Sequence, residues 1–139
     1  MDDRLLFLMS KAQHTMKNYV RREFTNGGVE FTPAQMGILF ALKLKNGLSM
    51  NILSEIVSID NAAVTRHVDT LERNGLITRT QDPEDRRKYM VSITEKGISE
   101  ADKSKEIVRK INSMLKEGFS EEEVEVYKRM LNSFFVKFK

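Results

Sequence analysis

The chain has 139 residues, of which 40% are hydrophobic and 31% are charged, so it can bury the core of one ordinary domain and stay soluble. Its formal net charge of +3 permits nucleic-acid binding but does not argue strongly for it. The absence of cysteine excludes disulfides and thiolate metal sites. With no basic apolar leader and no long unbroken apolar run, we expect a cytoplasmic protein that does not enter a membrane.

The first part of the chain alternates helical patterns with turn residues. Apolar side chains at spacings of three and four predict a first helix at about residues 3–24, which a Thr-Asn-Gly-Gly run then breaks. Thr32 and Gln35 form a capping box at the start of a second helix, and Pro33 suits its first position. The Asn-Gly pair at 46–47 ends that helix.

Two shorter helices follow, joined by a tight turn. Ser49 is the expected cap of the first, which reaches about Val57, and Asp60 is the expected cap of the second. Gly75 suits the left-handed position after the end of the second helix. Two short helices joined by about three residues form a helix-turn-helix. The expected inner face of its second helix consists of Val64, Val68 and Leu71.

The hydrophobic period then changes from helical to alternating. Residues 76–80 and 88–94 predict two strands, and residues 82–85 predict the turn of a hairpin. Thr94 caps a long helix, and a capping box that begins at Ser120 opens a last helix. The predicted fold is mainly α (α+β), with a winged helix-turn-helix core, a two-stranded β wing and flanking terminal helices.

The outer face of the second short helix is small and polar, so the helix can enter a DNA major groove about 12 Å wide. Arg66 offers a planar fork for guanine or phosphate, and Thr65 can bond phosphate or touch a thymine methyl. Ser49 and Asn51 lie beside free backbone amides that can hold a phosphate. The predicted major-groove face consists of Asn61, Ala62, Thr65, Arg66 and Asp69.

The hairpin places Asp85, Arg86, Arg87 and Lys88 at its tip. Adjacent arginines on a strand turn point in different directions, so one can reach a narrow minor groove while the other pairs with Asp85. Spacing alone does not choose between the two arginines. A solvated charged turn is the alternative interpretation of the hairpin taken alone, and its position directly after a helix-turn-helix favours DNA contact.

Four segments taken together resemble the signature of the MarR family of winged helix-turn-helix transcriptional regulators. They are Thr65-Arg66, 71–77 (LERNGLI), 82–87 (DPEDRR) and 91–97 (VSITEKG). This joint pattern is much more specific than a helix-turn-helix alone. The resemblance is strong from about residue 31 to residue 97, and outside that range it rests on the number and length of the helices.

The resemblance implies a single domain over residues 1–139, with a winged-helix core at residues 31–97. Residues 1–30 and 98–139 are then helices that dimerise. A monomer of this size would struggle to cover the apolar side chains near its end, although they could also close the monomer's own core. These side chains are Phe134, Phe135 and Phe138.

The resemblance also implies roles for the wing and for the whole chain. It assigns an Asp-x-Arg element to Asp85 and Arg87, in which Arg87 braces the tip, and it assigns the minor-groove probe to Arg86. It implies a homodimeric repressor that binds a pseudo-palindromic operator in double-stranded DNA. A small-molecule effector would release it by changing the separation of the two recognition helices.

Other chemistry has little support in the sequence. No nucleophile elbow, phosphate loop or dinucleotide fingerprint is present, so we predict neither an enzyme nor a cofactor. His14 and His67, without cysteine, are too few for a metal site. A second hypothesis is a protein-interaction module that keeps the winged helix. The residues expected to line an effector cavity are Met9, His14, Met16 and Met36.

Overall fold

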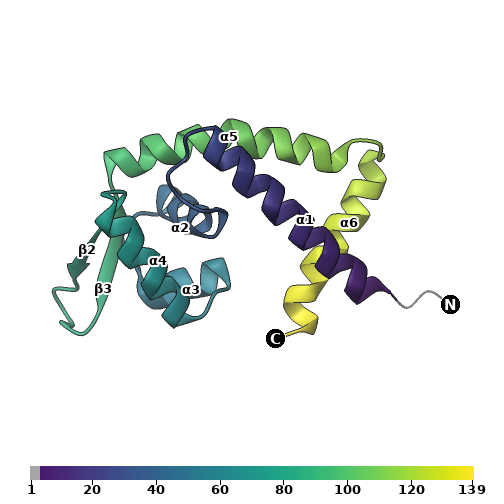
Figure 1. The fold of residues 1–139 in the computed structure, drawn as a ribbon. Helices are drawn as coiled ribbons and strands as arrows, with labels where there is room; N and C mark the ends of the chain where they lie inside the picture. The colour runs from purple at the N-terminus through teal and green to yellow at the C-terminus, as the bar shows by residue number, and fades with distance from the viewer. Residues whose placement is uncertain (1–3) are drawn as a thin grey trace. The chain divides into compact units, whose positions relative to one another are not determined.

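The chain folds into helices and one small sheet, which confirms the mainly α prediction. The computed structural model describes residues 4–139 and forms two compact units, residues 4–107 and residues 108–139. Figure 1 shows the elements in chain order. They are α1 (Leu5–Asn26), α2 (Pro33–Leu44), β1 (Leu48–Ser49), α3 (Met50–Val57), α4 (Asn61–Arg73), β2 (Ile77–Gln81), β3 (Tyr89–Ile93), α5 (Glu95–Lys116) and α6 (Glu121–Lys137).

The predicted caps begin the helices where the sequence indicated. The Thr32 hydroxyl accepts from the Gln35 backbone N–H, and the Gln35 side chain accepts in return from the Thr32 N–H. Asp60 accepts from the Ala63 N–H at 2.8 Å at the start of α4. Ser120 closes a second capping box at the start of α6. Each cap satisfies backbone donors that have no partner within the helix.

The sheet has three strands in the order β1-β3-β2, all antiparallel, where the sequence predicted two. The predicted hairpin is the β2–β3 pair, in which Arg79 lies opposite Val91. The additional strand, β1, pairs Leu48 with Val91 and Ser49 with Met90. A two-residue strand is too short to show alternation, so the sequence pattern could not reveal it.

The end of α4 explains why β2 begins one residue later than expected. Gly75 has a φ of +78°, and its N–H donates to the Glu72 carbonyl. The Leu76 N–H donates to the Leu71 carbonyl at 2.9 Å. These two bonds form the helix-ending motif that requires a left-handed residue after the cap, which is why glycine is favoured there. Leu76 therefore belongs to the end of the helix rather than to the strand.

The core of the first unit lies between α2, α3, α4 and the sheet. The expected inner face of α4 is buried, as are side chains from each neighbouring element. Burial of a side chain of this kind stabilises the fold by about 1.5–3 kcal/mol, so these elements form one rigid body. The fully buried large residues include Ile38, Leu39, Leu42, Leu53, Val64, Val68, Leu71, Leu76, Ile77 and Val91.

The start of α5 is fastened to the end of α4. The Thr94 hydroxyl donates to the Gly75 carbonyl at 2.7 Å and accepts from the Gly97 N–H at 3.0 Å, so Thr94 caps α5 as predicted. The Thr94 N–H donates to the Leu76 carbonyl at 3.0 Å. Lys96 Nζ donates to the Asn74 carbonyl at 3.0 Å. The hairpin thus begins and ends at one joint, which these hydrogen bonds form between residues 74–76 and residues 94–97.

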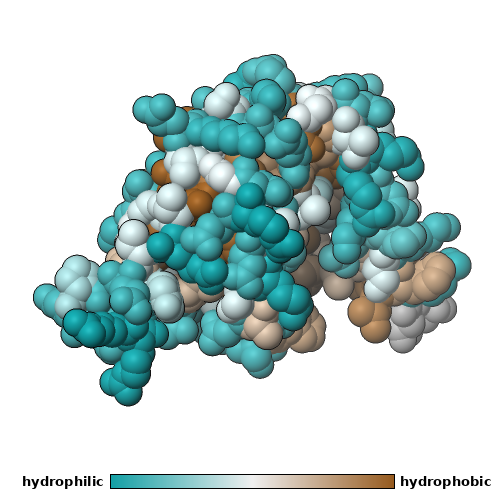
Figure 2. Space-filling model, turned by 60° about the vertical axis from the view of Figure 1, so that its left-hand side comes forward, coloured by the Kyte–Doolittle hydropathy of each residue, from teal (hydrophilic) through white to brown (hydrophobic). Residues whose placement is uncertain are grey.

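The surface combines hydrophilic areas with exposed hydrophobic ones, as the teal and brown regions of Figure 2 show. Within residues 4–139, no helix is both long enough and apolar enough to cross a membrane. The exposed apolar side chains are concentrated on α1 and on the C-terminal unit. On these two segments the most exposed are Leu5, Leu6, Val136 and Phe138, while Leu44 on α2 is more exposed still.

We expect Gly97→Ala to destabilise the joint between α4 and α5. A Cβ atom at this position would lie 2.1 Å from the Leu76 carbonyl oxygen and 2.7 Å from Ile93 Cγ1. Overpacking of this kind costs about 1–3 kcal/mol, and the upper end applies because a backbone atom is in the way. Thermal unfolding followed by circular dichroism should show a clearly lower Tm.

Gly37→Ala is the matched control, because it also adds a methyl group to a helical glycine. Its Cβ would lie 3.5 Å from Val57 Cγ1, which is an ordinary contact. The free energy of unfolding should stay equal or rise by about 0.4–1 kcal/mol, since alanine restricts the unfolded chain. Equal Tm values for Gly97→Ala and the wild type would contradict the close approach.

The ion pair between α2 and α5 should make stability depend on pH. Lys43 Nζ lies 2.6 Å from Asp102 Oδ1. Hydrogen bonds from Lys43 and then Lys105 hold the pKa of Asp102 below its ordinary value. Because this pKa is lower in the folded than in the unfolded chain, the pair stabilises the fold above the unfolded pKa, and the contribution is lost as the pH falls through the folded pKa.

Asp102→Asn should therefore lower the Tm at neutral pH and have progressively less effect below about pH 4, the range of an ordinary aspartate. Melting curves of the variant and the wild type across this range would measure the difference. A difference that stays constant down to about pH 2 would show that the carboxylate charge is not what stabilises the contact.

Candidate DNA-binding surface

The turn between α3 and α4 sets the angle of the helix-turn-helix. Ser58 ends α3 with φ and ψ of 54° and 42°, in the left-handed region. The Ser54 hydroxyl donates to the Ile59 carbonyl at 2.5 Å, and the Ile59 N–H donates to the Ser54 carbonyl at 3.3 Å. Asp60 then caps α4. The turn is thus held by side-chain and backbone bonds from both of its ends.

The two faces of α4 differ as the sequence predicted. Ala63, Val64, Val68 and Leu71 are buried. The Thr65 hydroxyl donates to the Asn61 carbonyl at 2.9 Å, so its oxygen lone pairs can still accept from another donor. No large apolar group projects from the outer face, which a major groove can therefore accommodate. The exposed residues on this face are Asn61, Ala62, Thr65 and Arg66.

Asp69, the fifth residue of the predicted groove face, is half-buried and has a partner. Its Oδ1 lies 2.7 Å from Arg79 Nη2 on β2. The same Nη2 lies 3.1 Å from Glu72 Oε1. Burial opposes the charge of Arg79, but the Glu72 hydrogen bond and the charges of Glu72 and Asp69 outweigh it and raise the pKa of Arg79. A direct contact of Asp69 with DNA stays a prediction.

The role of Arg79 was missing from the sequence interpretation, although a signal for it exists. Strand residues two apart share a face, so Arg79 lies on the same side of β2 as buried Ile77. A cation on the inner face of a strand requires an anionic partner. Asp69 and Glu72, three positions apart on α4, are on one face of that helix and supply it.

The hairpin tip presents three exposed cations, Arg86, Arg87 and Lys88. The strands close below them through the Asp82 N–H, which donates to the Lys88 carbonyl at 2.9 Å. Arg87 Nε lies 3.4 Å from Asp85 Oδ1, while the Arg87 side chain remains 92% exposed. In Figure 1 the β2–β3 hairpin extends beyond α2, α3 and α4.

Two of the three acids of the tip, Asp82 and Asp85, accept hydrogen bonds inside the turn. Asp82 Oδ1 accepts from the Glu84 N–H at 2.9 Å, and Asp85 Oδ1 accepts from the Arg87 N–H at 3.0 Å. The carboxylates therefore order the turn backbone. Arg86, Arg87 and Lys88 are exposed beside these ordered carboxylates, and so is Glu84.

The start of α3 provides the predicted phosphate site only in part. The Ser49 hydroxyl accepts from the Ile52 N–H at 3.2 Å, which uses one of the amides at this end. Asn51 is exposed. The amides of the first helical turn lie at the positive end of the helix dipole, so a phosphate oxygen is favoured there. This contact also stays a prediction.

The residues expected around an effector cavity lie on two helices. Met9, His14 and Met16 are exposed along α1, and Met36 is half-buried on α2. His14 Nε2 lies 3.2 Å from Asn18 Nδ2. No group of three His, Asp or Glu side chains in residues 4–139 could hold a metal ion. The effector cavity stays a prediction.

Known proteins with a similar sequence are transcriptional regulators. The family model described as the MarR family matches residues 31–89. The chain is 35% identical over 104 residues to the uncharacterized HTH-type transcriptional regulator YdgJ of Bacillus subtilis (strain 168), which is 72% of this chain and 63% of YdgJ. The chain spans 43% to 64% of the length of YdgJ and three further curated regulators.

Solved structures resemble the chain over almost its whole length. A probable transcriptional regulator from Pseudomonas aeruginosa has a TM-score of 0.82 and 28% identity, covering 96% of this chain and 98% of that one. MepR from S. aureus, solved in complex with DNA, has a TM-score of 0.90 and 24% identity, covering 99% and 100%. The MepR likeness concerns the fold alone.

Proposed function

Because this chain belongs to the MarR family of transcriptional regulators, we propose that it binds double-stranded DNA in a sequence-specific manner and acts as a repressor. The observation that supports this most is the presence, on one rigid unit, of a small polar face on α4 and an exposed arginine-bearing hairpin. The proposed activity is binding and not catalysis.

In this proposal α4 is the recognition helix. Arg66 would form paired hydrogen bonds with a guanine edge or hold a phosphate, and Thr65 would contact a phosphate or a thymine methyl. Asn61 and Ala62, at the exposed start of the helix, would lie nearest the base edges. The amides beside Ser49 and Asn51 would hold a backbone phosphate.

The hairpin is the proposed minor-groove element. Arg86 would enter the groove, where a narrow width enhances the negative potential. Arg87 already contacts Asp85 through its backbone N–H and its Nε, so it would brace the tip. Lys88 follows directly and would contact a phosphate. This division of roles between the two arginines is supported by the Asp85–Arg87 contact.

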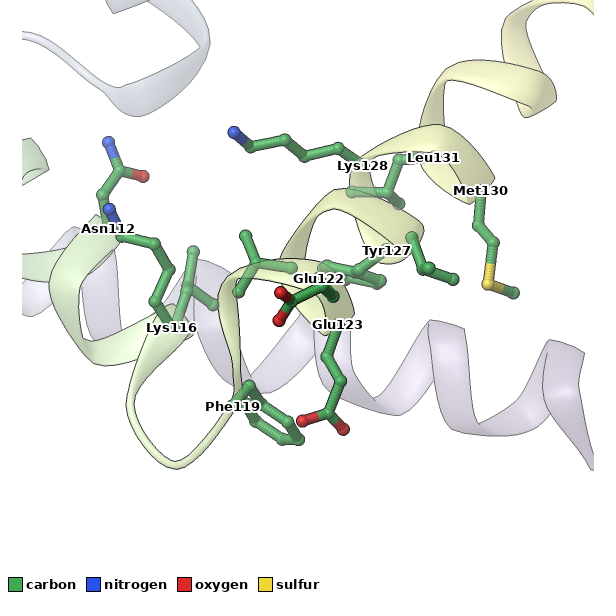
Figure 3. A pocket seen from close by; sticks show the side chains of 12 residues that line it. Asn112, Lys116, Phe119, Glu122, Glu123, Tyr127, Lys128, Met130 and Leu131 are labelled. Carbon is green, nitrogen blue, oxygen red and sulfur yellow. The ribbon is translucent and has the colours of Figure 1, made fainter.

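A homodimer is the proposed binding form, with residues 1–30 and 98–139 at its interface. The unit at residues 108–139 contains a groove of about 950 Å³ with mostly apolar walls, shown in Figure 3. Apolar surface that a single chain leaves exposed is typical of protein interfaces. Two copies would place their α4 helices about 34 Å apart, one turn of DNA, on a pseudo-palindromic operator. The apolar groove residues are Leu115, Phe119, Val124, Val126, Tyr127, Met130 and Leu131.

Release by a small-molecule effector completes the proposal. Met9, His14 and Met16 lie on α1 within residues proposed to dimerise. Methionine side chains adapt to irregular ligands, and histidine can bond an anionic or phenolic group. A ligand that favours one separation of the two recognition helices would shift the affinity for the operator by its differential affinity for the two states.

Arg86→Ala should weaken operator binding and lower its dependence on salt. Removal of one phosphate-neutralising cation reduces the slope of log K against log salt by about one unit. The operator would come from selection of bound fragments from random DNA, and titrations at several salt concentrations would give the slope. An unchanged slope together with unchanged affinity would contradict the proposed role of Arg86.

Lys17→Ala is the matched control, because it also removes one cation. Lys17 is exposed on α1, outside the helix-turn-helix and the hairpin. Its affinity and salt slope should match those of the wild type. A wild-type chain that shows no preference for any selected fragment would end the proposal of sequence-specific binding.

Phe135→Glu should convert the proposed dimer into a monomer. Phe135 is 66% exposed on α6 in the single chain, so a charge there costs little unless a partner covers it. Arg129→Glu introduces the same side chain on a different face of α6, since two positions separate Arg129 from Leu131 and turn a helix by about 200°. Sedimentation velocity should show a monomer only for Phe135→Glu. A wild-type monomer would contradict the proposed dimer.

A further inference from the structure

Arg79 connects α4 with both strands of the hairpin. Its Nη2 contacts Asp69 Oδ1 at 2.7 Å and Glu72 Oε1 at 3.1 Å, both on α4. Its backbone N–H donates to the other Glu72 oxygen, Oε2, at 3.0 Å. Its guanidinium carbon lies 5.9 Å from the centre of the Tyr89 ring on β3. One residue of β2 therefore makes three contacts with two residues of α4 and one contact with the opposite strand.

This cluster restricts motion more than a simple surface ion pair does. An isolated exposed pair contributes about 0–1 kcal/mol, because water and side-chain entropy oppose it. Here the side chain of Arg79 is only 25% exposed. Glu72 binds Arg79 through both carboxylate oxygens, since Oε1 accepts from Nη2 and Oε2 accepts from the backbone N–H. Arg79 Nη2 contacts both carboxylates while the planar guanidinium lies over the Tyr89 ring, a combination that the compact ammonium of a lysine does not reproduce.

The connection between α4 and β2 is short and contains a glycine. Asn74, Gly75 and Leu76 separate the last residue of α4 from the first of β2. The joint at Leu76 and Thr94 fastens the base of the hairpin, but it lies at one end of β2. Arg79 is three residues beyond Leu76, so it adds a second point of attachment between the hairpin and the helix.

We propose that Arg79 is a positioning residue that fixes the angle between α4 and the hairpin, so that the recognition helix and Arg86 reach the DNA together. This inference rests on the proposed function. In this inference Arg79 acts by position and not by touching DNA, because its Nη2 is engaged by Asp69 and Glu72 and its guanidinium lies over Tyr89. Binding groups that are held in place before association lose less entropy when they bind.

The same cluster has an electrostatic consequence that the test must separate from positioning. Asp69 and Glu72 bring two negative charges to the helix that carries Arg66. Arg79 offsets part of that charge, so its loss would also increase repulsion of phosphates. Neutral substitutions of Asp69 and Glu72 can restore the charge balance that Arg79 provides. They cannot restore a fixed angle between α4 and the hairpin.

A double-mutant cycle between Arg79 and Arg86 tests the inference. Dissociation constants for the selected operator would be measured by fluorescence anisotropy for the wild type, Arg79→Met, Arg86→Ala and the double variant. Arg86→Ala should weaken binding about tenfold in the wild type and less than about threefold in Arg79→Met, because a misplaced hairpin no longer delivers Arg86 to the groove. Equal factors in the two backgrounds would overturn the positioning role.

Two further variants separate position from charge. Arg79→Lys keeps the charge but loses the planar guanidinium over Tyr89, and it should bind almost as weakly as Arg79→Met. A triple variant adds Asp69→Asn and Glu72→Gln to Arg79→Met. It removes the two acidic charges without restoring the contacts of Arg79, so binding should stay weak. Recovery of wild-type affinity in either variant would show that Arg79 acts through its charge alone.

Amide hydrogen exchange without DNA distinguishes failure of this inference from failure of the proposed function. Exchange in residues 77–93 should rise in Arg79→Met while exchange in α2 stays at the wild-type level. Glu72→Gln, on a partly exposed side chain, provides the same test if Arg79→Met does not fold. Unchanged hairpin exchange would overturn the inference even if the wild type binds DNA. If the wild type binds no duplex, the proposed function fails. The exchange measurement then decides by itself whether Arg79 holds the hairpin in place.

Discussion

The backbone of Leu76 holds together the parts of the molecule on which the proposed DNA-binding surface depends. Its N–H closes the end of α4 by donating to the Leu71 carbonyl, and its carbonyl accepts from the Thr94 N–H at the start of α5. Its side chain is fully buried. Because Gly97 packs against that carbonyl with no room for a Cβ, α4, the hairpin and α5 share one fixed point.

Much of this fold follows from local chemistry that the sequence displays openly. Caps at Thr32, Asp60 and Ser120 and a left-handed glycine after α4 are decided within a few residues, so spacing predicts them correctly. Strand β1 depends instead on a partner more than forty positions away, Val91 opposite Leu48, and two residues carry no periodic signal. Pairing at that distance is a property of the folded chain.

The candidate site also contains some features that the sequence predicts and others that it does not. The exposed polar face of α4 and the cations of the tip could be identified from helical and strand periodicity, because exposure follows from which side chains are apolar. The partners of the charged groups could not be identified from periodicity. Asp69 pairs with Arg79, a contact that the sequence interpretation did not include, and Asp82 and Asp85 use their carboxylates on the turn backbone. Ion pairing depends on side-chain direction in three dimensions, which composition does not record.

The left-handed backbone of Ser58 limits how the helix-turn-helix can vary. Side chains branched at Cβ are strongly disfavoured in this region, whereas glycine, asparagine and aspartate tolerate it. Neighbouring turn positions with ordinary dihedral angles accept a wider range of residues. If this turn were randomised, backbone geometry would restrict the residue at position 58 before any selection for DNA sequence preference, and valine or isoleucine there would strain the turn.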